Sequence, residues 1–136
     1  MSDRVDAEMG FAREAINLRE LRQKVLASNI ADADTPGYQA RDIDFSAQLT
    51  RALTRGRAAE PALSLTLTAG QHIPAVARPV ILPHLLYRVP DQPAADGNTV
   101  DMDRERVQFA DNSVRYQADL TLLSARIKQM MSVMQG

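Results

Sequence analysis

The sequence contains no cysteine and no tryptophan, and only 4% of its 136 residues are aromatic. The absence of cysteine excludes disulfides, thiolate zinc sites and a cysteine nucleophile. Because the large burial energy of aromatic side chains is mostly missing, alanine, leucine and methionine must provide most of the packing. This composition favours helices packed on helices over a thick globular core.

A strong excess of one charge is also lacking. The formal net charge is −1 and the pI is about 6.1, so no nucleic-acid partner is expected. Neither sign of charge forms a long block, which argues against a membrane-surface role. No run of about 18 apolar residues is present, so no direct membrane insertion is expected. The charged N-terminal stretch does not have the apolar run of a cleavable signal peptide.

The sequence motifs of catalysis are missing as well. There is no glycine-rich phosphate loop, no G-x-S-x-G and no H-E-x-x-H. His72 and His84 have no acidic residues at metal-ligand spacing, which favours solvated side chains over a metal site. Capping and turn formation explain the carboxylates Asp32, Asp34, Asp42 and Asp44 more simply than acid–base catalysis does. We therefore predict no enzyme, no cofactor and no metal.

Residues 3 to about 31 are predicted to form one helix with a narrow polar strip and two apolar stripes. The polar strip consists of Asp6, Arg13, Asn17, Glu20, Lys24 and Ser28. The first apolar stripe consists of Phe11, Leu18, Leu21 and Val25, and the second of Val5, Met9, Ala12 and Ile16. Two stripes predict neighbours on more than one side of the helix. The alternative is a small monomer in which one stripe is partly exposed.

The helix is predicted to stop at the turn Thr35-Pro36-Gly37-Tyr38. Proline fixes φ at the first central position of the turn, and glycine allows a positive φ at the second. The proline also disfavours the helical conformation at the residue before it. Taken alone, such a turn indicates only that a helix ends.

The middle of the chain is less regular. Between residues 39 and 54, Phe45, Leu49 and Leu53 share a helical face and indicate a short amphipathic helix. Six of the seven prolines lie between Pro61 and Pro93, so this stretch is expected to be an excursion, partly extended or disordered, that orders against something else. Residues 80–82 and 85–89 are candidates for short strands or extended pieces, and residues 96–98 for a turn.

The last segment is predicted to be a long helix from about residue 102 to 135, with Asp101 as its N-cap. Its apolar row has alternating spacings of four and three, the pattern of a coiled-coil seam: Phe109, Tyr116, Leu120, Leu123, Ile127, Met130 and Met134. A second row of mostly small residues would permit close helix approach on another side: Val107, Ala110, Val114, Ala118 and Ala125.

Together these features predict one mainly α domain in which the long N- and C-terminal helices pair, parallel or antiparallel, as a coiled-coil or helical-bundle core. Its parts are residues 1–54 (helix, turn and short segment), 55–100 (proline-rich excursion) and 101–136 (heptad helix). A buried seam side chain contributes about 1.5–3 kcal/mol against about 1–2 kcal/mol of backbone entropy per ordered residue. An isolated pair would be marginal, so packing against other copies is expected to complete it.

The stretch around the helix-stop turn resembles a signature of the axial proteins of the bacterial flagellum. Its residues are Ser28, Asn29, Ile30, Ala31, Asp32, Ala33, Asp34, Thr35, Pro36, Gly37 and Tyr38, with Asp32 in place of the usual asparagine. Three further stretches resemble the proximal rod subunits of that family: ARDIDF, DGNTVDMDRE and FADNSVRYQADLTLLSARIKQM.

The resemblance implies a structural subunit of the flagellar basal-body proximal rod, a hollow, torque-transmitting shaft in the periplasm. The implied partners are other copies, adjacent proximal rod subunits and the ring–rod junction protein. Members of the family pass through the flagellar type III export apparatus without signal cleavage. Phe45 and Leu49 fit a phenylalanine-plus-apolar pattern associated with docking at that export gate.

Two other interpretations start from the residues alone. The first is a soluble helical-hairpin binding module, such as an export chaperone or adaptor, with the proline-rich excursion as its recognition element. The second is an enzyme with a site in residues 55–100, which would need a pocket that this composition cannot enclose. Neither explains the helix-stop motif together with the heptad seam.

Overall fold

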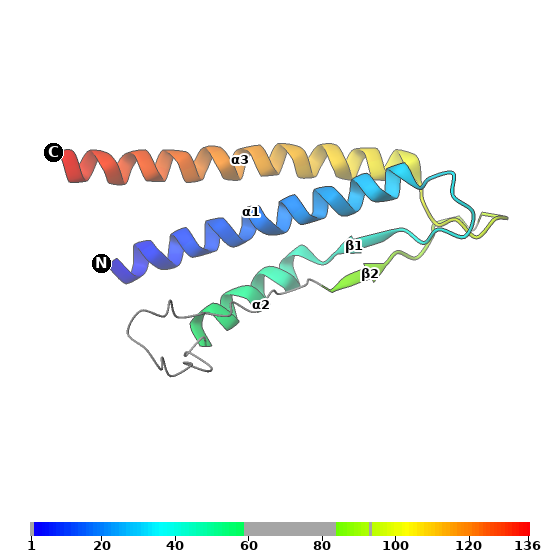
Figure 1. Cartoon of the computed structure of the whole chain (residues 1–136), viewed down its shortest axis with the longest axis horizontal. Coiled ribbons are helices and arrows are strands. Elements are labelled where there is room, and N and C mark those ends of the chain that lie inside the picture. The colour runs from blue at the N-terminus through cyan, green and yellow to red at the C-terminus, as the bar shows by residue number, and fades with distance from the viewer. Residues whose placement is uncertain (1, 59–83, 93) are drawn as a thin grey trace, which may run out of the picture.

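The computed structural model describes residues 2–58, 84–92 and 94–136, and shows two long helices with a short helix and a two-stranded ribbon beside them (Figure 1). In chain order the elements are α1 (Ser2–Ala31), β1 (Arg41–Ile43), α2 (Phe45–Ala58), β2 (Leu85–Tyr87) and α3 (Met102–Gln135). His72, the predicted strand at residues 80–82 and most of the proline-rich excursion lie outside the described residues.

The two long helices, α1 and α3, run antiparallel, so that both termini lie at the same end of the molecule (Figure 1). They contain 30 and 34 residues and pack against each other along most of their length. At 1.5 Å per residue they are about 45 and 50 Å long. The structure confirms the mainly α fold with paired terminal helices and resolves the question of their relative direction.

The boundaries of these helices follow from the local sequence. The Asp101 carboxylate accepts hydrogen bonds from the backbone nitrogens of Asp103 and Arg104, which confirms the predicted N-cap of α3. At the other boundary, Tyr38 N donates to Thr35 O at 3.2 Å across the predicted turn. Gly37 has a φ of 73°, as the second central position of that turn requires.

The ribbon consists of β1 and β2 in antiparallel register, with Arg41 opposite Tyr87 and Ile43 opposite Leu85. A strand at Leu85–Tyr87 agrees with the sequence prediction, whereas β1 is not predicted. Its three residues are mostly polar, and its partner is more than 40 positions away, so no local pattern reveals it. The predicted short helix is present as α2, with Phe45, Leu49 and Leu53 half-buried.

The apolar core is small and is centred on α1. Its buried members are Ala15, Ile16, Leu18, Leu26, Ala40 and Ile43. Because α1 contacts α3 as well as α2 and β1, both of its apolar stripes have neighbours within the chain. The polar strip is exposed along its whole length, as predicted. The N-terminal parts of the stripes remain uncovered, with Val5 40% and Phe11 45% exposed.

Candidate functional site

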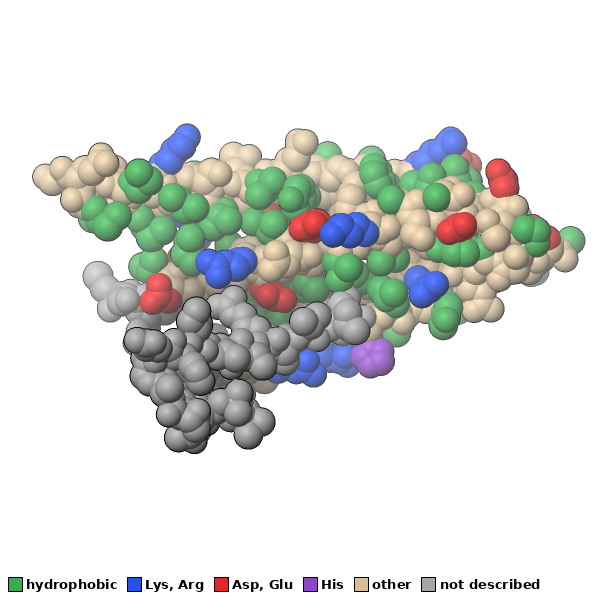
Figure 2. Space-filling view, viewed as in Figure 1, with side chains coloured by type: hydrophobic (Ala, Val, Ile, Leu, Met, Phe, Trp, Pro, Cys, Tyr) green, Lys and Arg blue, Asp and Glu red, His purple; other side chains and the backbone are tan. Residues whose placement is uncertain are grey.

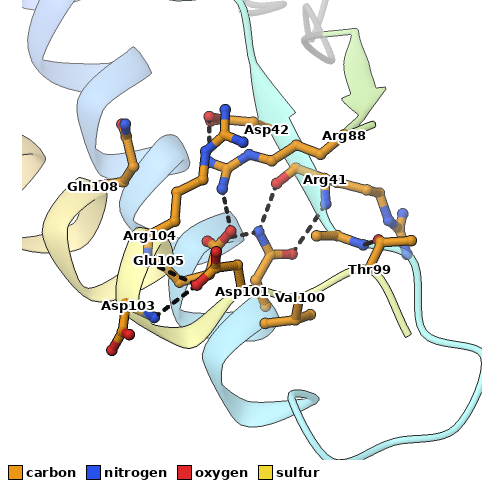
Figure 3. Close-up of polar contacts among 12 residues, drawn as sticks. Arg41, Asp42, Arg88, Thr99, Val100, Asp101, Asp103, Arg104, Glu105 and Gln108 are labelled. Atoms are coloured by element: carbon orange, nitrogen blue, oxygen red, sulfur yellow. Dashed lines mark hydrogen bonds and ion pairs between the residues drawn. The ribbon is translucent and has the colours of Figure 1, made fainter. Parts of the chain in front are cut away.

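The end of α1, the ribbon and the start of α3 meet in a polar cluster that we call the joint. We define it by Asn29, Asp42, Arg88 and Glu105. Figure 3 shows how Asp42 and Arg88 from the ribbon side face Glu105 from the first turns of α3. The joint therefore connects segments that lie far apart in the sequence.

Asn29 is fully buried, and its side-chain amide forms hydrogen bonds through both its nitrogen and its oxygen. Its Nδ2 donates to Arg41 O at 2.7 Å and to Glu105 Oε2 at 3.1 Å. Its Oδ1 accepts hydrogen bonds from Arg41 N at 3.1 Å and from the Tyr38 hydroxyl at 3.2 Å. An amide has two donor hydrogens and two acceptor lone pairs, and all four are occupied here. This motif residue therefore joins the end of α1 to β1, to the turn and to α3.

The charges of the joint alternate in sign. Glu105 is only 1% exposed and forms an ion pair with Arg88, which also donates to Asp42 Oδ2 at 2.6 Å. Asp42 accepts two further hydrogen bonds from Arg22, at 3.0 and 3.1 Å. Each carboxylate has a guanidinium beside it, which compensates for burial of the charge. Removing one member would leave its partner as an uncompensated buried charge.

The ionisation of Asp42 reflects this arrangement. Burial alone would raise the pKa of Asp42, but the hydrogen bonds from Arg22, Arg88 and the backbone N of Ile43 outweigh burial, and its pKa lies below the ordinary value. The hydrogen bond to Asp42 in turn raises the pKa of Arg22, although burial opposes that shift. Asp42 is therefore a carboxylate that favours the folded chain at neutral pH.

Asn98 holds the segment that follows α1 from a distant part of the sequence. Its Nδ2 lies 3.1, 2.9 and 2.8 Å from the backbone oxygens of Asp32, Ala33 and Thr35. These three carbonyl groups lie after Ala31, the last residue of α1, so Asn98 fixes the segment that joins α1 to the helix-stop turn. The predicted turn at residues 96–98 is present, and it provides this donor.

The two turns approach each other closely at their glycines. Gly97 has a φ of 77°, and a Cβ on it would lie 3.7 Å from the Cα of Gly37. Gly37 N also donates to Asp96 O at 2.9 Å. Asp32, the departure from the family motif, stays within its own turn, where its Oδ1 accepts from Thr35 Oγ1 at 3.2 Å. The substitution leaves the geometry of the turn intact.

The contact between α1 and α3 includes a polar residue at every seventh position of α3, a series that we call the ladder: Glu105, Asn112, Asp119 and Arg126. Glu105 binds Asn29, and Asn112 Nδ2 donates to Arg19 O at 2.9 Å and to Gln23 Oε1 at 2.7 Å. The outer two members form ion pairs, Asp119 with Arg19 and Arg126 with Glu8. Polar residues at a helix interface fix the register of the pair.

The structure divides the predicted apolar seam of α3 into two sets. Half-buried residues again recur every seven positions: Phe109, Tyr116, Leu123 and Met130. The remaining members are more exposed, with Leu120 at 39%, Ile127 at 40% and Met134 at 79%. The second row is also exposed: Val107, Ala110, Val114, Ala118 and Ala125. Figure 2 shows hydrophobic side chains gathered over the C-terminal half of α3.

The other predicted site residues are less uniform in burial. On α1, Leu18 is buried, Leu21 and Val25 are half-buried, and Phe11 is exposed. In the helix-stop motif, Asn29 is buried, Ile30 and Tyr38 are half-buried, and the exposed members are Ser28, Ala31, Thr35, Pro36 and Gly37. The candidate export residues lie on α2, where the Arg19 guanidinium stacks over the Phe45 ring at 4.4 Å. His84 is exposed.

The sequence prediction does not include the joint or the ladder. The seven-residue spacing of the ladder is visible in the sequence and could have identified it. No sequence spacing indicates the ion pairs of Arg22 and Arg88 with Asp42, because these pairs form only when β1 and β2 pair as the ribbon. Within the described residues, no group of three metal-ligating side chains is present and no helix is long and apolar enough to cross a membrane.

Comparison with known proteins identifies relatives of this chain. The model of a family described as "Flagella basal body rod protein" matches residues 9–39. The chain is 60% identical over 136 residues to the flagellar basal body rod protein FlgB of Salmonella typhimurium, covering 100% of this chain and 99% of the relative.

More distant relatives carry the same name. The FlgB protein of Escherichia coli K12 is 59% identical with the same coverage. That of Cereibacter sphaeroides is 43% identical over 129 residues, covering 95% of this chain and 94% of the relative. These similarities do not favour the interpretation as a soluble binding module.

Proposed function

The chain belongs to the family of flagellar basal body rod proteins and is a structural subunit of that rod, and we propose that it builds the proximal part of the rod by packing its terminal helices against neighbours. Those neighbours are other copies, adjacent proximal rod subunits and the ring–rod junction protein. Repeated contacts of this kind would give a helical, hollow shaft. The names of the relatives point to a structural protein and away from an enzyme.

The observation that carries this proposal is the apolar surface that α3 leaves uncovered. Ile127 is 40% exposed, Met131 48%, Val133 77% and Met134 79%. Exposed hydrophobic residues that lie together usually mark an interaction surface. Since the ladder already holds α3 to α1, these side chains are available to a neighbouring subunit without separation of the helix pair.

We further propose that the rod built from this chain transmits torque, and the joint supports this proposal. A satisfied polar network in a water-poor environment makes a structure rigid. Here such a network connects α1, the ribbon and α3, so rotation applied to one segment would be passed to the others. The ribbon and α2 would then move with the helix pair as one body.

We also propose that the chain reaches the periplasm through the flagellar type III export apparatus without cleavage of a signal peptide. Phe45 and Leu49 would dock at the export gate before folding. Both side chains are half-buried on α2 in the folded chain, so they would be available to the gate only while α2 is unformed. Export would therefore precede formation of the α1–α2 contact.

Aspartate substitution on the exposed face of α3 tests the assembly proposal. Ile127→Asp should stop rod assembly and motility while the purified chain keeps its helical content, because Ile127 is 40% exposed. Gln129→Asp, an exposed polar position on the same helix, is the matched control and should leave motility intact. Leu123→Asp should also stop assembly but should lower helicity, because Leu123 is half-buried in the chain. Normal motility with Ile127→Asp would contradict the proposal.

A further inference from the structure

Arg19 lies near the middle of α1 and contacts the helices on both sides of it. Its Nε donates a hydrogen bond to Asp119 on α3, and its guanidinium lies over the ring of Phe45 on α2, 4.4 Å from the ring centre. In Figure 1, α1 runs between α3 and α2 and contacts both of them. One side chain of α1 therefore connects three helices.

The two contacts use different parts of the guanidinium. The hydrogen bond to Asp119 comes from the edge of the planar group, whereas the contact with Phe45 uses its face. Both can exist at once, and the bond at the edge fixes the direction of the plane. Because only 13% of the Arg19 side chain is exposed, little water competes with the attraction between the cation and the ring.

The contact with Phe45 depends on the contact with Asp119. A buried cation is stable only when it is paired, so without Asp119 the guanidinium would turn towards water and leave the ring. Asp119 also faces the same side of the helix pair as α2, since it lines a groove together with Ala52 and Leu53. Loss of the α3 contact would therefore weaken the contact between α1 and α2.

Phe45 is the first residue of α2, so its contact with Arg19 holds the start of this helix. The apolar face of α2 includes Phe45, Leu49 and Leu53, all of them half-buried, and α1 is the helix that α2 contacts most. Leu49 lies one turn after Phe45 on that face. Release of Phe45 would let the first turn of α2 separate from α1 and would uncover Leu49 next.

We propose that Arg19 makes the docking of α2 depend on the pairing of α3 with α1. In the chain whose terminal helices are paired, Phe45 and Leu49 are half-buried. In the chain whose C-terminal helix has not yet paired, Arg19 has no Asp119 to hold it, and Phe45 is uncovered. The inference rests on the proposed function in one respect, since Phe45 and Leu49 are the residues proposed to dock at the export gate.

The contact would act as an autoinhibitory device. Phe45 lies in the first half of the chain and Asp119 in the last helix, so the candidate export residues would stay accessible until that helix is in place. Completion of the α1–α3 pair would then withdraw them, and a folded subunit would no longer present them to the gate. The α1–α3 pair would thus control α2 as well as form the assembly surface.

Thiol labelling measures the opening of α2, because the native chain has no cysteine. Leu49→Cys places one thiol on the half-buried face of α2. In this background Asp119→Asn, which keeps the shape but removes the charge, should raise the labelling rate about threefold, the size expected for one cation–π contact. Glu8→Gln is the matched control, since it removes an exposed ion pair between α1 and α3 that has no member on α2. It should raise the rate less than about 1.5-fold.

A double substitution shows whether α3 acts through Arg19. Arg19→Gln alone should raise the labelling rate of the Leu49→Cys chain as much as Asp119→Asn does. When Arg19→Gln is already present, Asp119→Asn should not raise the rate further, because the side chain through which it acts is gone. Arg19→Lys is the milder replacement. It keeps a cation for Asp119 but has no flat face to place on Phe45, so it should still raise the rate while circular dichroism shows intact helices.

Two results would overturn the coupling. One is an equal rise from Asp119→Asn with and without Arg19, which would show that α3 acts on α2 by another route. The other is an equal rate for Asp119→Asn and Glu8→Gln, which would show that any lost ion pair between the long helices loosens α2.

Export of the full chain separates this inference from the proposed function. Phe45→Ser together with Leu49→Ser should lower the amount exported, because both residues are proposed to dock at the gate. Unchanged export would refute that docking and with it the autoinhibitory role, while the labelling rates would still decide the coupling through Arg19. Lowered export together with additive labelling effects would leave the proposed function standing and overturn only the coupling.

Discussion

Among alanine substitutions of the polar residues of α1, Asn29→Ala should lower the free energy of unfolding most. The substitution removes four hydrogen bonds, one of them to the buried carboxylate of Glu105. A hydrogen bond contributes about 0.5–1.5 kcal/mol net, and one to a charged group about 1.5–3 kcal/mol. Because the partners at Arg41 and Glu105 remain without an equivalent donor, we expect a loss of about 3–4 kcal/mol in the free energy of unfolding. That is a large share of the 5–15 kcal/mol of a typical domain.

The measurement is urea unfolding followed by circular dichroism at 222 nm, the usual wavelength for helix, with the slope m compared between variants. Asn17→Ala is the matched control, because Asn17 lies on the same helix and is exposed. It should change stability by less than about 0.5 kcal/mol. Asn29→Asp keeps the shape but replaces the donor with a second carboxylate beside Glu105, so it should cost at least as much as alanine. Equal midpoints for Asn29→Ala and Asn17→Ala would refute the role of Asn29 in the joint.

Four further predictions concern single residues. Gly37→Ala should lower the free energy of unfolding by about 1–2 kcal/mol, because φ at this position is 73°. Gly10→Ala should raise it by up to about 1 kcal/mol, because Gly10 lies in open space on α1. Thermal melts compare the two variants. Asn98→Ala should lower the free energy of unfolding by about 2 kcal/mol and should speed amide exchange in residues 32–38, measured by NMR. The pKa of Asp42 is below its ordinary 3.8, so its stabilisation is present above pH 3.8 and is lost as pH falls through the folded-state pKa. The native chain should therefore be more stable than Asp42→Asn at neutral pH, and this difference in the free energy of unfolding should shrink below about pH 4. Urea titrations at each pH measure it. Asn112 Nδ2 donates to Arg19 O and Gln23 Oε1, so Asn112→Ala should lower the urea midpoint by the equivalent of about 1–3 kcal/mol.

Much of the fold could be predicted because its signals are local. The cap at Asp101, the positive φ at Gly37 and the spacing of apolar residues in α3 each depend on a few neighbouring positions. The strand β1 could not be predicted, because a three-residue polar strand exists only through its pairing with β2. The same holds for the hydrogen bonds of Asn98, whose acceptors are more than 60 positions earlier in the chain.

The surface through which α3 packs on α1 could be predicted in kind but not in detail. The apolar row of α3 indicates a helix interface, but one row does not say which of its members face the partner within the chain. The contact with α1 determines which face of α3 lies inward. The polar side chains of Glu8, Arg19 and Asn29 on α1 bind the ladder and hold α3 in one rotational orientation. As a result, Leu123 turns towards the core while Ile127 stays partly exposed.

The ladder also explains why the pair is not held together by apolar residues alone. A fully apolar seam on α3 could pair with any long apolar helix, in either direction and in several registers. Glu105 and Asn112 are buried in the interface and penalise each of those alternatives, because a wrong partner leaves an unpaired amide or charge there. The cost is lower stability of the pair. The gain is that α3 binds its own α1 in one register, while part of its apolar surface stays exposed.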